Sequence, residues 1–380
     1  MKTVVIDRCP HYYGEEPLKA LERVLEPLGG MENFVRPGQT VLLKPNLLRK
    51  AREEEVVTTH PALVRAAAEL VKKAGGKPII GDSPGAALQH NRNTLLKLYR
   101  ACGLDRAALA SGADLALGSG FRTVPLPRGR TVKRIEVIDA ALDADVIINL
   151  GKLKTHSFTI LTGAVKNLFG LVPGLIKPGY HARFPDVDDF ASMLVDIADF
   201  ADPALTIIDA VWAMEGAGPG AGDRKELGLV VAGTGPAEID VVLSRIIGID
   251  PLDVPTVREC VRRGLLEKDL SGIEIRGETV ESVRPESFRV PPGRPHPFPR
   301  WAMPFMPVAK YLLSTRPRIN RKKCVGCGDC ERVCPVGVIE MPKGKAAIRT
   351  TGCIRCFCCH ETCAYRAIDL VRPLFQRLVV

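Results

Sequence analysis

The sequence predicts an α/β fold with a largely parallel sheet and flanking helices, followed by a small α+β module rich in cysteine. Strand-like and helix-like segments alternate over roughly the first 280 residues, as they do in α/β domains. The strand-like segments are short and rich in Val, Ile and Leu, which is typical of strands covered on both faces. Eight of the twelve cysteines repeat one spacing near the C-terminus. The 380 residues therefore suffice for two or three domains.

Short apolar runs and helix punctuation define the elements of the larger part. The predicted strands are residues 3–7, 40–44, 78–81, 146–150, 205–209, 227–232 and 273–276. A helix is expected over 61–74, because Pro61 stands at its first turn and two glycines follow its end. Two further helices are expected over about 187–200 and over 237–247. Strands and helices in this order predict a parallel sheet.

Composition changes twice along the chain and predicts three regions. Residues 1–283 form the α/β domain, 284–320 form a linker, and 321–380 form the cysteine-rich module. Six prolines stiffen the first half of the linker. An apolar stretch around Trp301, edged with basic residues, follows them. We expect this stretch to act as a strap that packs the module onto the larger domain; the alternative is a peripheral membrane contact through 300–316.

The cysteines predict the cofactor. They form the runs Cys324-x2-Cys327-x2-Cys330-x3-Cys334-Pro335 and Cys353-x2-Cys356-x2-Cys359-x3-Cys363. This is the bacterial ferredoxin spacing, in which the fourth cysteine of each run ligates the other of two [4Fe–4S] clusters. Cluster 1 would take Cys324, Cys327, Cys330 and Cys363, and cluster 2 would take Cys353, Cys356, Cys359 and Cys334. Zinc sites use paired spacings, and disulfides need an oxidising compartment, so both readings are disfavoured.

Two details depart from the ferredoxin spacing. The second run ends in Ala364 where the pattern usually has proline, and we expect a changed turn with the cluster retained. Cys358 is an extra thiol beside Cys359. It is interpreted as a small buried residue, with a substitute ligand or a redox-sensitive thiol near cluster 2 as the alternative.

The charge of the chain is strongly positive and partly local. The formal net charge is +10, and two oxidised clusters at roughly −2 each bring it nearer to +6. Basic residues without an intervening acid precede the first ligand: Arg316, Arg318, Arg321, Lys322 and Lys323. We expect this run to offset cluster charge and to offer a docking face for an acidic redox partner. Few aromatics interleave with it, so nucleic-acid binding is disfavoured.

A cationic cluster follows the fourth predicted strand. Lys152, Lys154 and His156 leave the expected strand end, where open α/β sheets bind ligands. Lys166 and Asn167 follow a glycine that opens a short helix. These side chains are predicted to converge on a phosphate or carboxylate, with Lys177, Tyr180 and His181 adding cations and donors. The alternative is a solvated loop with scattered charges.

Other polar strand ends give weaker signals. Asp82, Asp209 and Glu215 could bind a hydroxyl group or a metal, although each alone is more often a cap or turn residue. The glycine-rich segment 216–222 lacks the third glycine of a nucleotide loop and is expected to be a mobile loop. The turn 233–235 has Glu238 at the third-glycine position, so dinucleotide binding is disfavoured.

Together these motifs resemble the family called domain of unknown function 362. The similar segments are Lys44-Pro45-Asn46, Gly81-Asp82-Ser83, Lys152-x-Lys154-Thr155-His156, the segment 163–170, and Asp240 through Pro251. Many members carry a C-terminal dicluster ferredoxin. The resemblance implies a cytosolic prokaryotic iron–sulfur protein whose working site lies between Lys152 and Asn167, and it names no reaction.

Three functions follow from these features, in decreasing order of expectation. The first is an oxidoreductase whose clusters pass electrons to an anionic substrate or cofactor in the α/β domain. The second is an electron carrier or adaptor whose α/β domain docks a partner oxidoreductase. The third is a cluster-dependent regulator that binds nucleic acid. The N-terminus reads as a strand, with no export signal or membrane span, so we expect a cytoplasmic protein.

Overall fold

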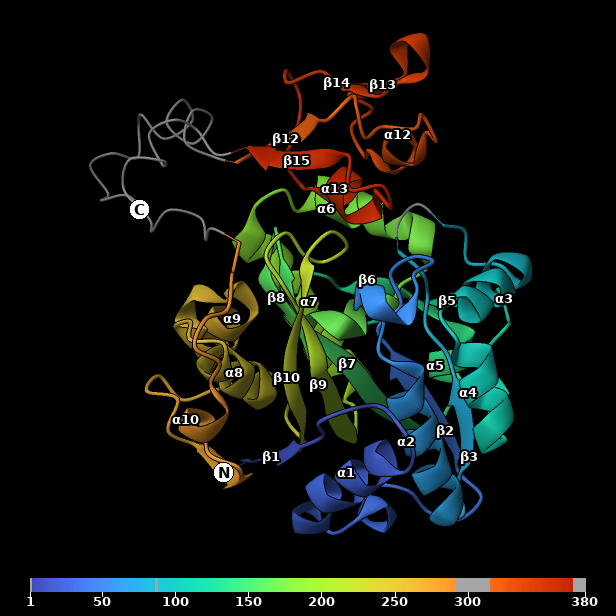
Figure 1. Ribbon diagram of the computed structural model, residues 1–380, viewed down its shortest axis with the longest axis vertical. Coiled ribbons are helices and arrows are strands. Elements are labelled where there is room, and N and C mark those ends of the chain that lie inside the picture. The colour runs from blue at the N-terminus through green and yellow to red at the C-terminus, as the bar shows by residue number, and fades with distance from the viewer. Residues whose placement is uncertain (1, 86–87, 292–314, 372–380) are drawn as a thin grey trace.

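A nine-stranded sheet forms the centre of the larger domain (Figure 1). The computed structural model describes residues 2–85, 88–291 and 315–371. The spatial order of the strands is β11 (Ile273–Gly277), β1 (Lys2–Arg8), β10 (Asp223–Gly233), β9 (Leu205–Glu215), β7 (Val146–His156), β2 (Thr40–Pro45), β3 (Lys77–Ile80) and β4 (Asp114–Leu115). The short β8 (Ile160–Gly163) pairs with β7 beyond this path. All seven predicted strands are therefore present.

The sheet is mixed but mostly parallel, which confirms the predicted fold class. The neighbours β11–β1, β9–β7, β7–β2, β2–β3 and β3–β4 run parallel. The pairs β1–β10, β10–β9 and β7–β8 run antiparallel. Strands β7, β9 and β10 are longer than predicted. In β7 and β10, charged and glycine residues that read as a strand end or a loop continue in the sheet, and β9 continues through the apolar residues 210–214.

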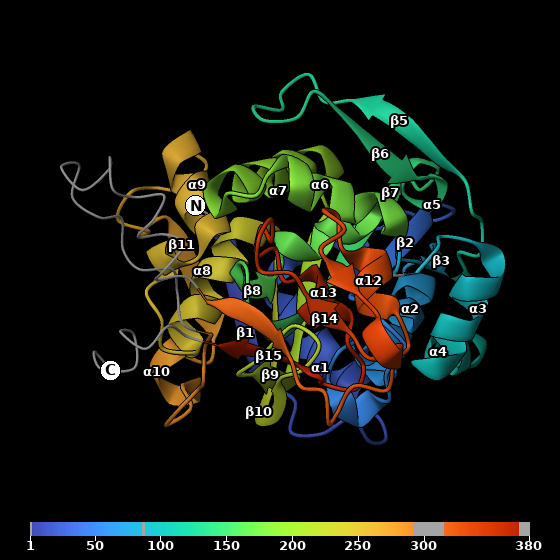
Figure 2. The ribbon, with the colours of Figure 1, turned by 90° about the horizontal axis from the view of Figure 1, so that it is seen from above.

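Helices cover both faces of the sheet (Figures 1 and 2). One face packs against α1 (Glu16–Leu25), α2 (Pro61–Lys73), α3 (Arg92–Ala101) and α4 (Leu104–Ser111). The other packs against α7 (Val187–Ala201), α8 (Pro236–Ile246) and α9 (Pro255–Arg263). Neighbouring residues of a strand serve opposite faces, as Leu42 and Leu43 do. The strands are consequently buried on both sides, as their apolar sequence predicts.

The three predicted helices lie within two residues of their expected bounds. The side chain of His60 caps α2 by accepting a hydrogen bond from the Ala62 N–H, and Asp186 caps α7 in the same way. The remaining helical segments are short: α5 (Asp139–Leu142), α6 (Lys177–Arg183), α10 (Val280–Val283), and the 3₁₀ turns η1 (Glu26–Leu28), η2 (Met31–Asn33), η3 (Glu53–Glu55), η4 (Lys166–Leu171), η5 (Gly174–Ile176), η6 (Pro251–Asp253) and η8 (Pro342–Gly344).

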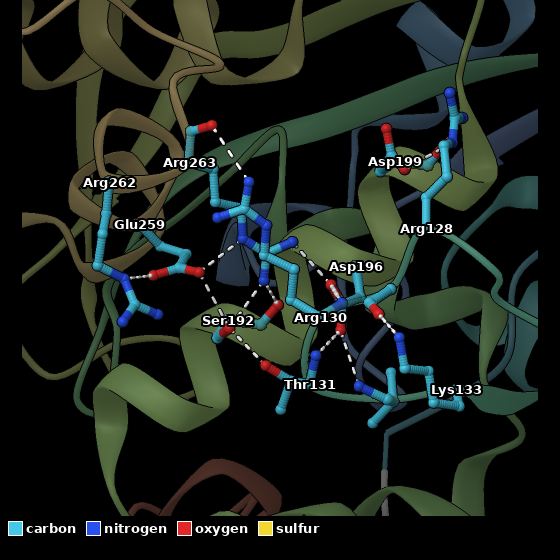
Figure 3. A network of polar contacts seen from close by, with 12 residues as sticks. Arg128, Arg130, Thr131, Lys133, Ser192, Asp196, Asp199, Glu259, Arg262 and Arg263 are labelled. Atoms are coloured by element: carbon cyan, nitrogen blue, oxygen red, sulfur yellow. Dashed lines mark hydrogen bonds and ion pairs between the residues drawn. The ribbon is translucent and has the colours of Figure 1, made fainter.

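A β-hairpin extends along the α7 side of the domain (Figure 2). It consists of β5 (Phe121–Pro125) and β6 (Arg134–Ile138), and its turn is fixed by a buried polar network (Figure 3). The carboxylate of Asp196 accepts the backbone N–H groups of residues 130, 131 and 132 at 2.7–2.8 Å. Arg263 joins Asp196 at 2.7 Å and Glu259 at 2.6 Å. This network ties the hairpin to α7 and α9.

The C-terminal module lies on the side of the domain where β7 ends (Figure 1). It contains the antiparallel pairs β12 (Arg316–Ile319) with β15 (Ile368–Val371) and β13 (Ile339–Glu340) with β14 (Ala347–Ile348). Two short helices, α12 (Asp329–Val333) and α13 (Cys358–Thr362), follow the cysteine loops. Residues 316–319, expected within the linker, thus form a strand of the module. Most of the apolar strap, including Trp301, lies outside the described residues.

Among the described residues, no helix is both long enough and apolar enough to cross a membrane.

Candidate functional site

The eight cysteines of the two runs line two cavities in the module. Cys324, Cys327, Cys330 and Cys363 line the first. The residues Cys334, Cys353, Cys356 and Cys359 line the second. The fourth cysteine of each run therefore lies beside the first three of the other run. We call these spaces the first and the second cavity.

The cavities fit iron–sulfur clusters in their donor chemistry. Thiols are the main donors, and the remaining walls are largely apolar, with Ile319 and Met341 in the first cavity and Ile339 and Ile348 in the second. Cys358 also lines the second cavity and is 2% exposed. The first cavity lies toward the surface, since Cys327 is exposed. When bound, such a cluster accepts and returns one electron at a time.

The loops around the cavities differ in their backbone chemistry. The first loop turns through Gly326 and Gly328, both with φ near +77°. The equivalent positions of the second loop are Arg355 and Phe357, with φ of 57° and 63°. A residue with a side chain costs about 1–2 kcal/mol in this conformation. Phe357 is 8% exposed and packs in the large apolar cluster of the α/β domain, so its burial, worth about 2–3 kcal/mol, offsets the strain.

Helix α13 lies between the module and the α/β domain (Figure 1). Its first two residues, Cys358 and Cys359, line the second cavity. Its Glu361 is buried, and Oε1 lies 3.1 Å from Nε2 of His156 at the end of β7. Burial alone would raise the pKa of Glu361, but pairing with His156 and the charge of Lys166 outweigh it and hold this pKa below its usual range. Burial lowers the pKa of His156 to about 4, so the imidazole is neutral at neutral pH.

A second contact holds the module against the loop after β9. The guanidinium of Arg366 donates to the carbonyl of Gly222 at 2.8 Å and to Asp223 at 3.2 Å. The backbone of Gly220 passes so close that a Cβ there would lie 2.5 Å from the carbonyl oxygen of Glu361. Only glycine permits this approach. The segment 216–222 is therefore packed between the domains, where the sequence predicts a mobile loop.

Lys152 and Lys154 lie inside β7 and do not leave its end as expected. Lys152 Nζ lies 2.7 Å from Asp209 and 3.1 Å from the hydroxyl of Tyr12. Lys154 Nζ donates to the carbonyls of Val57 at 2.8 Å and Pro219 at 3.3 Å. Each lysine is 1% exposed, so the alternative of a solvated loop is wrong. Burial lowers the pKa of both groups, and that of Lys154 falls well below its usual value.

Lys166 and Asn167 begin η4, and Asp240 of α8 fixes this turn. The Asp240 carboxylate accepts the N–H of Ala164 at 2.6 Å and that of Val165 at 3.1 Å. Burial raises the pKa of Asp240 to about 7. The amide of Asn167 donates to Asn149 at 2.8 Å. Lys166 is only partly buried, and its ammonium lies 6.0 Å from the centre of the Phe169 ring.

These side chains belong to a larger cationic cluster. The lysines of this cluster are Lys44, Lys152, Lys154, Lys166 and Lys177, and its carboxylates are Asp82, Asp209 and Glu361. We call this set the lysine cluster. Lys44 pairs with Asp82 at 2.9 Å, and Lys152 pairs with Asp209. Lys154 and Lys177 bond to carbonyl oxygens only, and burial lowers the pKa of Lys177 to about 7. Lysines thus outnumber carboxylates, and an added anion would favour the charged forms of Lys154 and Lys177.

Several buried polar atoms near the lysine cluster have no hydrogen-bond partner in the described protein. They include the Ser83 hydroxyl, the Thr162 hydroxyl and Nδ1 of His181. Burial lowers the pKa of His181 to about 3, and its ring stacks on Phe190 at 4.3 Å between centroids. Tyr180 points elsewhere and donates to Glu136 at 2.8 Å. Of the three residues expected to assist, Lys177 belongs to the lysine cluster, His181 lies near it, and Tyr180 does not bond to it.

The acidic strand-end residues are committed to ion pairs. Asp82 and Asp209 neutralise buried lysines, and Glu215 pairs with Arg289 at 2.9 Å. Within the described ranges, no three His, Cys, Asp or Glu side chains gather to hold a single metal ion. Sequence reasoning missed Glu361, because the ferredoxin spacing requires no acid between Cys359 and Cys363. It also missed Phe357, whose side chain reaches the apolar core.

Comparisons with known proteins agree with these two parts. The family model described as Domain of unknown function (DUF362) matches residues 41–245. The model described as 4Fe-4S binding domain matches 316–339, and 28 residues are 54% identical to Ferredoxin-2 of Desulfomicrobium norvegicum, covering 7% of this chain and 48% of that protein. The protein therefore contains an iron–sulfur binding region.

Two further matches cover more of the chain. A protein of Synechocystis sp. named as thylakoid-associated is 39% identical over 269 residues, which is 70% of this chain and 80% of that protein. The lactate racemase apoprotein of Thermoanaerobacterium thermosaccharolyticum is similar with a TM-score of 0.36 and 16% identity, over 54% of this chain and 50% of that one. On the family match and the Synechocystis relative, the chain belongs to the family of the domain of unknown function DUF362.

Proposed function

We propose that the protein is an iron–sulfur oxidoreductase that binds two [4Fe–4S] clusters and passes electrons to an anionic substrate or cofactor held in the α/β domain. One observation carries this proposal. Glu361 extends from the helix beside the second cavity to His156, a residue of the family motif. The motif thus adjoins the inner cluster site, where an electron acceptor must lie to be reduced.

Each cysteine has a role in this proposal. Cys324, Cys327, Cys330 and Cys363 would hold cluster 1, and Cys353, Cys356, Cys359 and Cys334 would hold cluster 2. The crossed arrangement around two cavities supports these sets. Cys358 also lines the second cavity, but four other cysteines already supply the ligands of cluster 2. We therefore assign Cys358 a packing role.

The lysine cluster would bind the anion. Lys154 and Lys166 pair with no carboxylate among the described residues, and Asn167 and His156 add hydrogen-bonding groups. Because the pKa of His156 is about 4, this residue acts as a neutral hydrogen-bond partner and is a poor proton donor at neutral pH. Lys166, partly open to solvent, is the better candidate to deliver a proton.

Anaerobic purification with iron and sulfide analysis tests the first part. About eight irons, the count that two cubes require, are expected, and about four would contradict it. For the second part, dithionite-reduced protein is mixed with a panel of carboxylates, phosphates and flavin nucleotides, and cluster reoxidation is followed by absorbance. Lys166→Ala should abolish reoxidation by the active acceptor with the cluster content unchanged. The exposed Lys97→Ala is the matched control, and turnover that survives Lys166→Ala would refute the site.

An electron carrier or adaptor is the second candidate. It is favoured by the fact that Lys152, Lys154 and His156 bond to protein groups, which is the condition of a structural core. In this case the clusters are reduced normally, the acceptor panel stays inactive, and another oxidoreductase co-purifies. An acceptor that requires Lys166 excludes it.

The surface at the first cavity supports an acidic redox partner. Val325 and Tyr365 line this cavity and are 55% and 52% exposed. Lys323 precedes Cys324, and the backbone of Gly326 touches that of Gly344 beside the exposed Lys343. An apolar centre with a basic rim suits the docking of an acidic protein. Binding of an acidic flavodoxin that weakens with salt would support this role, whereas equally salt-sensitive binding of DNA would favour the regulator.

We also propose a cytoplasmic location, in which cysteine ligands stay reduced. The Synechocystis relative is named as thylakoid-associated, and this makes the contact through 300–316 worth testing. Cell fractionation checks both. Recovery in the soluble fraction supports the cytoplasm, and recovery on membranes that is lost on deleting 300–313 supports the peripheral contact.

A further inference from the structure

Opposite charges of the α/β domain and of the module lie beside the second cavity. Glu361 and Cys358 belong to the same short helix, and Cys358 lines the cavity. Phe357, also in its wall, packs in the same apolar cluster as Leu168 and Phe169, the neighbours of Lys166. Glu361 and Cys358 both lie close enough to Lys166 to act on its charge. Lys166 is therefore within electrostatic range of the helix whose Cys358 and Cys359 line this cavity.

The charges behind Lys166 have the same sign. Lys44, Lys154 and Lys177 lie close enough to affect Lys166 or to be affected by it. Of these three, only Lys44 has a described carboxylate partner, Asp82. The Glu361 carboxylate lies 3.1 Å from Nε2 of His156 and contacts no lysine ammonium among the described residues. Lys44 is neutralised by Asp82 and burial disfavours the charged forms of Lys154 and Lys177, so the partly exposed Lys166 is the main source of positive field here, and the Glu361 carboxylate opposes it.

The first cavity has another environment. Cys327, Val325 and Tyr365 are exposed to water. The charges in and around its wall include Asp329, which pairs with Arg332, and Lys345, which donates to the carbonyl of Cys324. The basic residues of its rim, Arg321, Lys322, Lys323 and Lys343, are exposed to water. Water screens such surface charges, and a neutralised pair contributes little field. The first cavity thus lacks an equivalent of the lysine cluster.

Reduction adds one electron to a cluster and makes its charge more negative by one. A cation nearby stabilises the reduced form, and it does so more strongly where burial lowers the effective dielectric constant from about 80 to about 20. We propose that Lys166 raises the reduction potential of the cluster at the second cavity above that of the cluster at the first, and that Glu361 limits the rise. Electrons that enter at the surface would then come to rest beside the α/β domain. This inference rests on the proposed binding of two clusters.

Potentiometric titration of the anaerobic holoprotein, followed by electron paramagnetic resonance, measures the two potentials without any substrate. The signals are assigned with Cys327→Ser and Cys356→Ser, each of which alters the signal of its own cluster. In the unmodified protein, the cluster at the second cavity should be reduced first. Lys166→Gln should lower the potential of this cluster, and Glu361→Gln should raise it. The other cluster should keep its potential in both variants.

Two controls separate charge from structural disturbance. Lys166→Arg keeps the charge and should restore the potential. Lys343→Gln removes an equal charge from the exposed surface and should leave the inner cluster unchanged. Shifts of the same sign in Lys166→Gln and Glu361→Gln, equal shifts of both clusters, or no shift with about eight irons present would overturn the inference alone. A protein with about four irons would overturn the proposed two clusters as well.

Discussion

Two buried networks of charged residues in this protein differ in how their charges are matched. In the hairpin network (Figure 3), Arg263 lies between Asp196 and Glu259, and all three side chains are at most 5% exposed. In the lysine cluster, Lys154 and Lys177 bond to carbonyl oxygens instead. The first network satisfies its charges internally. The second keeps buried lysines without counterions, so burial disfavours their charged forms; this arrangement costs stability and is more readily explained by function.

The position of each network agrees with this distinction. The hairpin network joins elements of one domain and fixes a turn. The lysine cluster lies at the carboxyl ends of β2 and β7, where α/β sheets place their ligands, and it faces the cysteine module. Substitutions in the two networks should therefore have different consequences. Stability should depend mainly on the first, and electron transfer mainly on the second.

Asp196→Ala should have the largest effect on stability. It removes the acceptor of three backbone N–H groups and one partner of Arg263, so the free energy of unfolding should fall by about 3–5 kcal/mol. Urea unfolding followed by circular dichroism measures it. Asp199→Ala, which breaks the half-exposed pair with Arg128, is the matched control and should cost less than about 1 kcal/mol. Equal losses in the two variants would remove the distinction between buried and surface charge.

Asp240→Asn tests the carboxylate that accepts hydrogen bonds from the two backbone N–H groups just before Lys166. The pKa of Asp240 is about 7 in the folded protein and near 3.8 when unfolded, so the folded state binds more protons between these values. Stability therefore falls as pH rises from about 4 to about 7, by roughly 2–4 kcal/mol from this group. Asparagine cannot ionise, so the variant should lose this slope.

Unfolding free energies measured at several pH values across this window check the expectation. The exposed Asp189→Asn is the control and should keep the slope of the unmodified protein. A variant Asp240→Asn with an unchanged slope would show that another group causes the dependence. Its effect on cluster potentials should be small, since Asp240 contacts the backbone of η4 and lies behind Lys166.

The sequence predicts the parts built from local patterns. Short apolar runs predict seven strands, and proline, glycine and capping residues predict three helices within two residues of their bounds. Cysteine spacing predicts the crossed grouping because a short loop determines which thiols can share a cavity. It does not predict that β7 continues through Lys152 and Lys154, because their burial depends on Asp209 and on the carbonyl of Val57, which are distant in the chain.

The same limit explains the contacts between the domains. His156 and Glu361 are about two hundred residues apart, and neither local pattern indicates a partner. Phe357 takes a backbone conformation that its residue type disfavours, so local preference argues against the observed turn. Its burial in the α/β domain supplies the compensation. Tertiary packing thus decides the features that connect the cysteine module to the family motif.

Lys166→Met should have the smallest effect on stability and so separates the two networks most sharply. No described carboxylate loses its partner in this variant, because Glu361 keeps His156, and a partly buried ammonium is replaced by an apolar side chain of similar length. The free energy of unfolding should change by less than about 1 kcal/mol, in either direction. Reoxidation by the anionic acceptor should nevertheless be lost. If Lys166→Met instead destabilised the protein as strongly as Asp196→Ala, the lysine cluster would be a structural core like the hairpin network, and the carrier function would gain support.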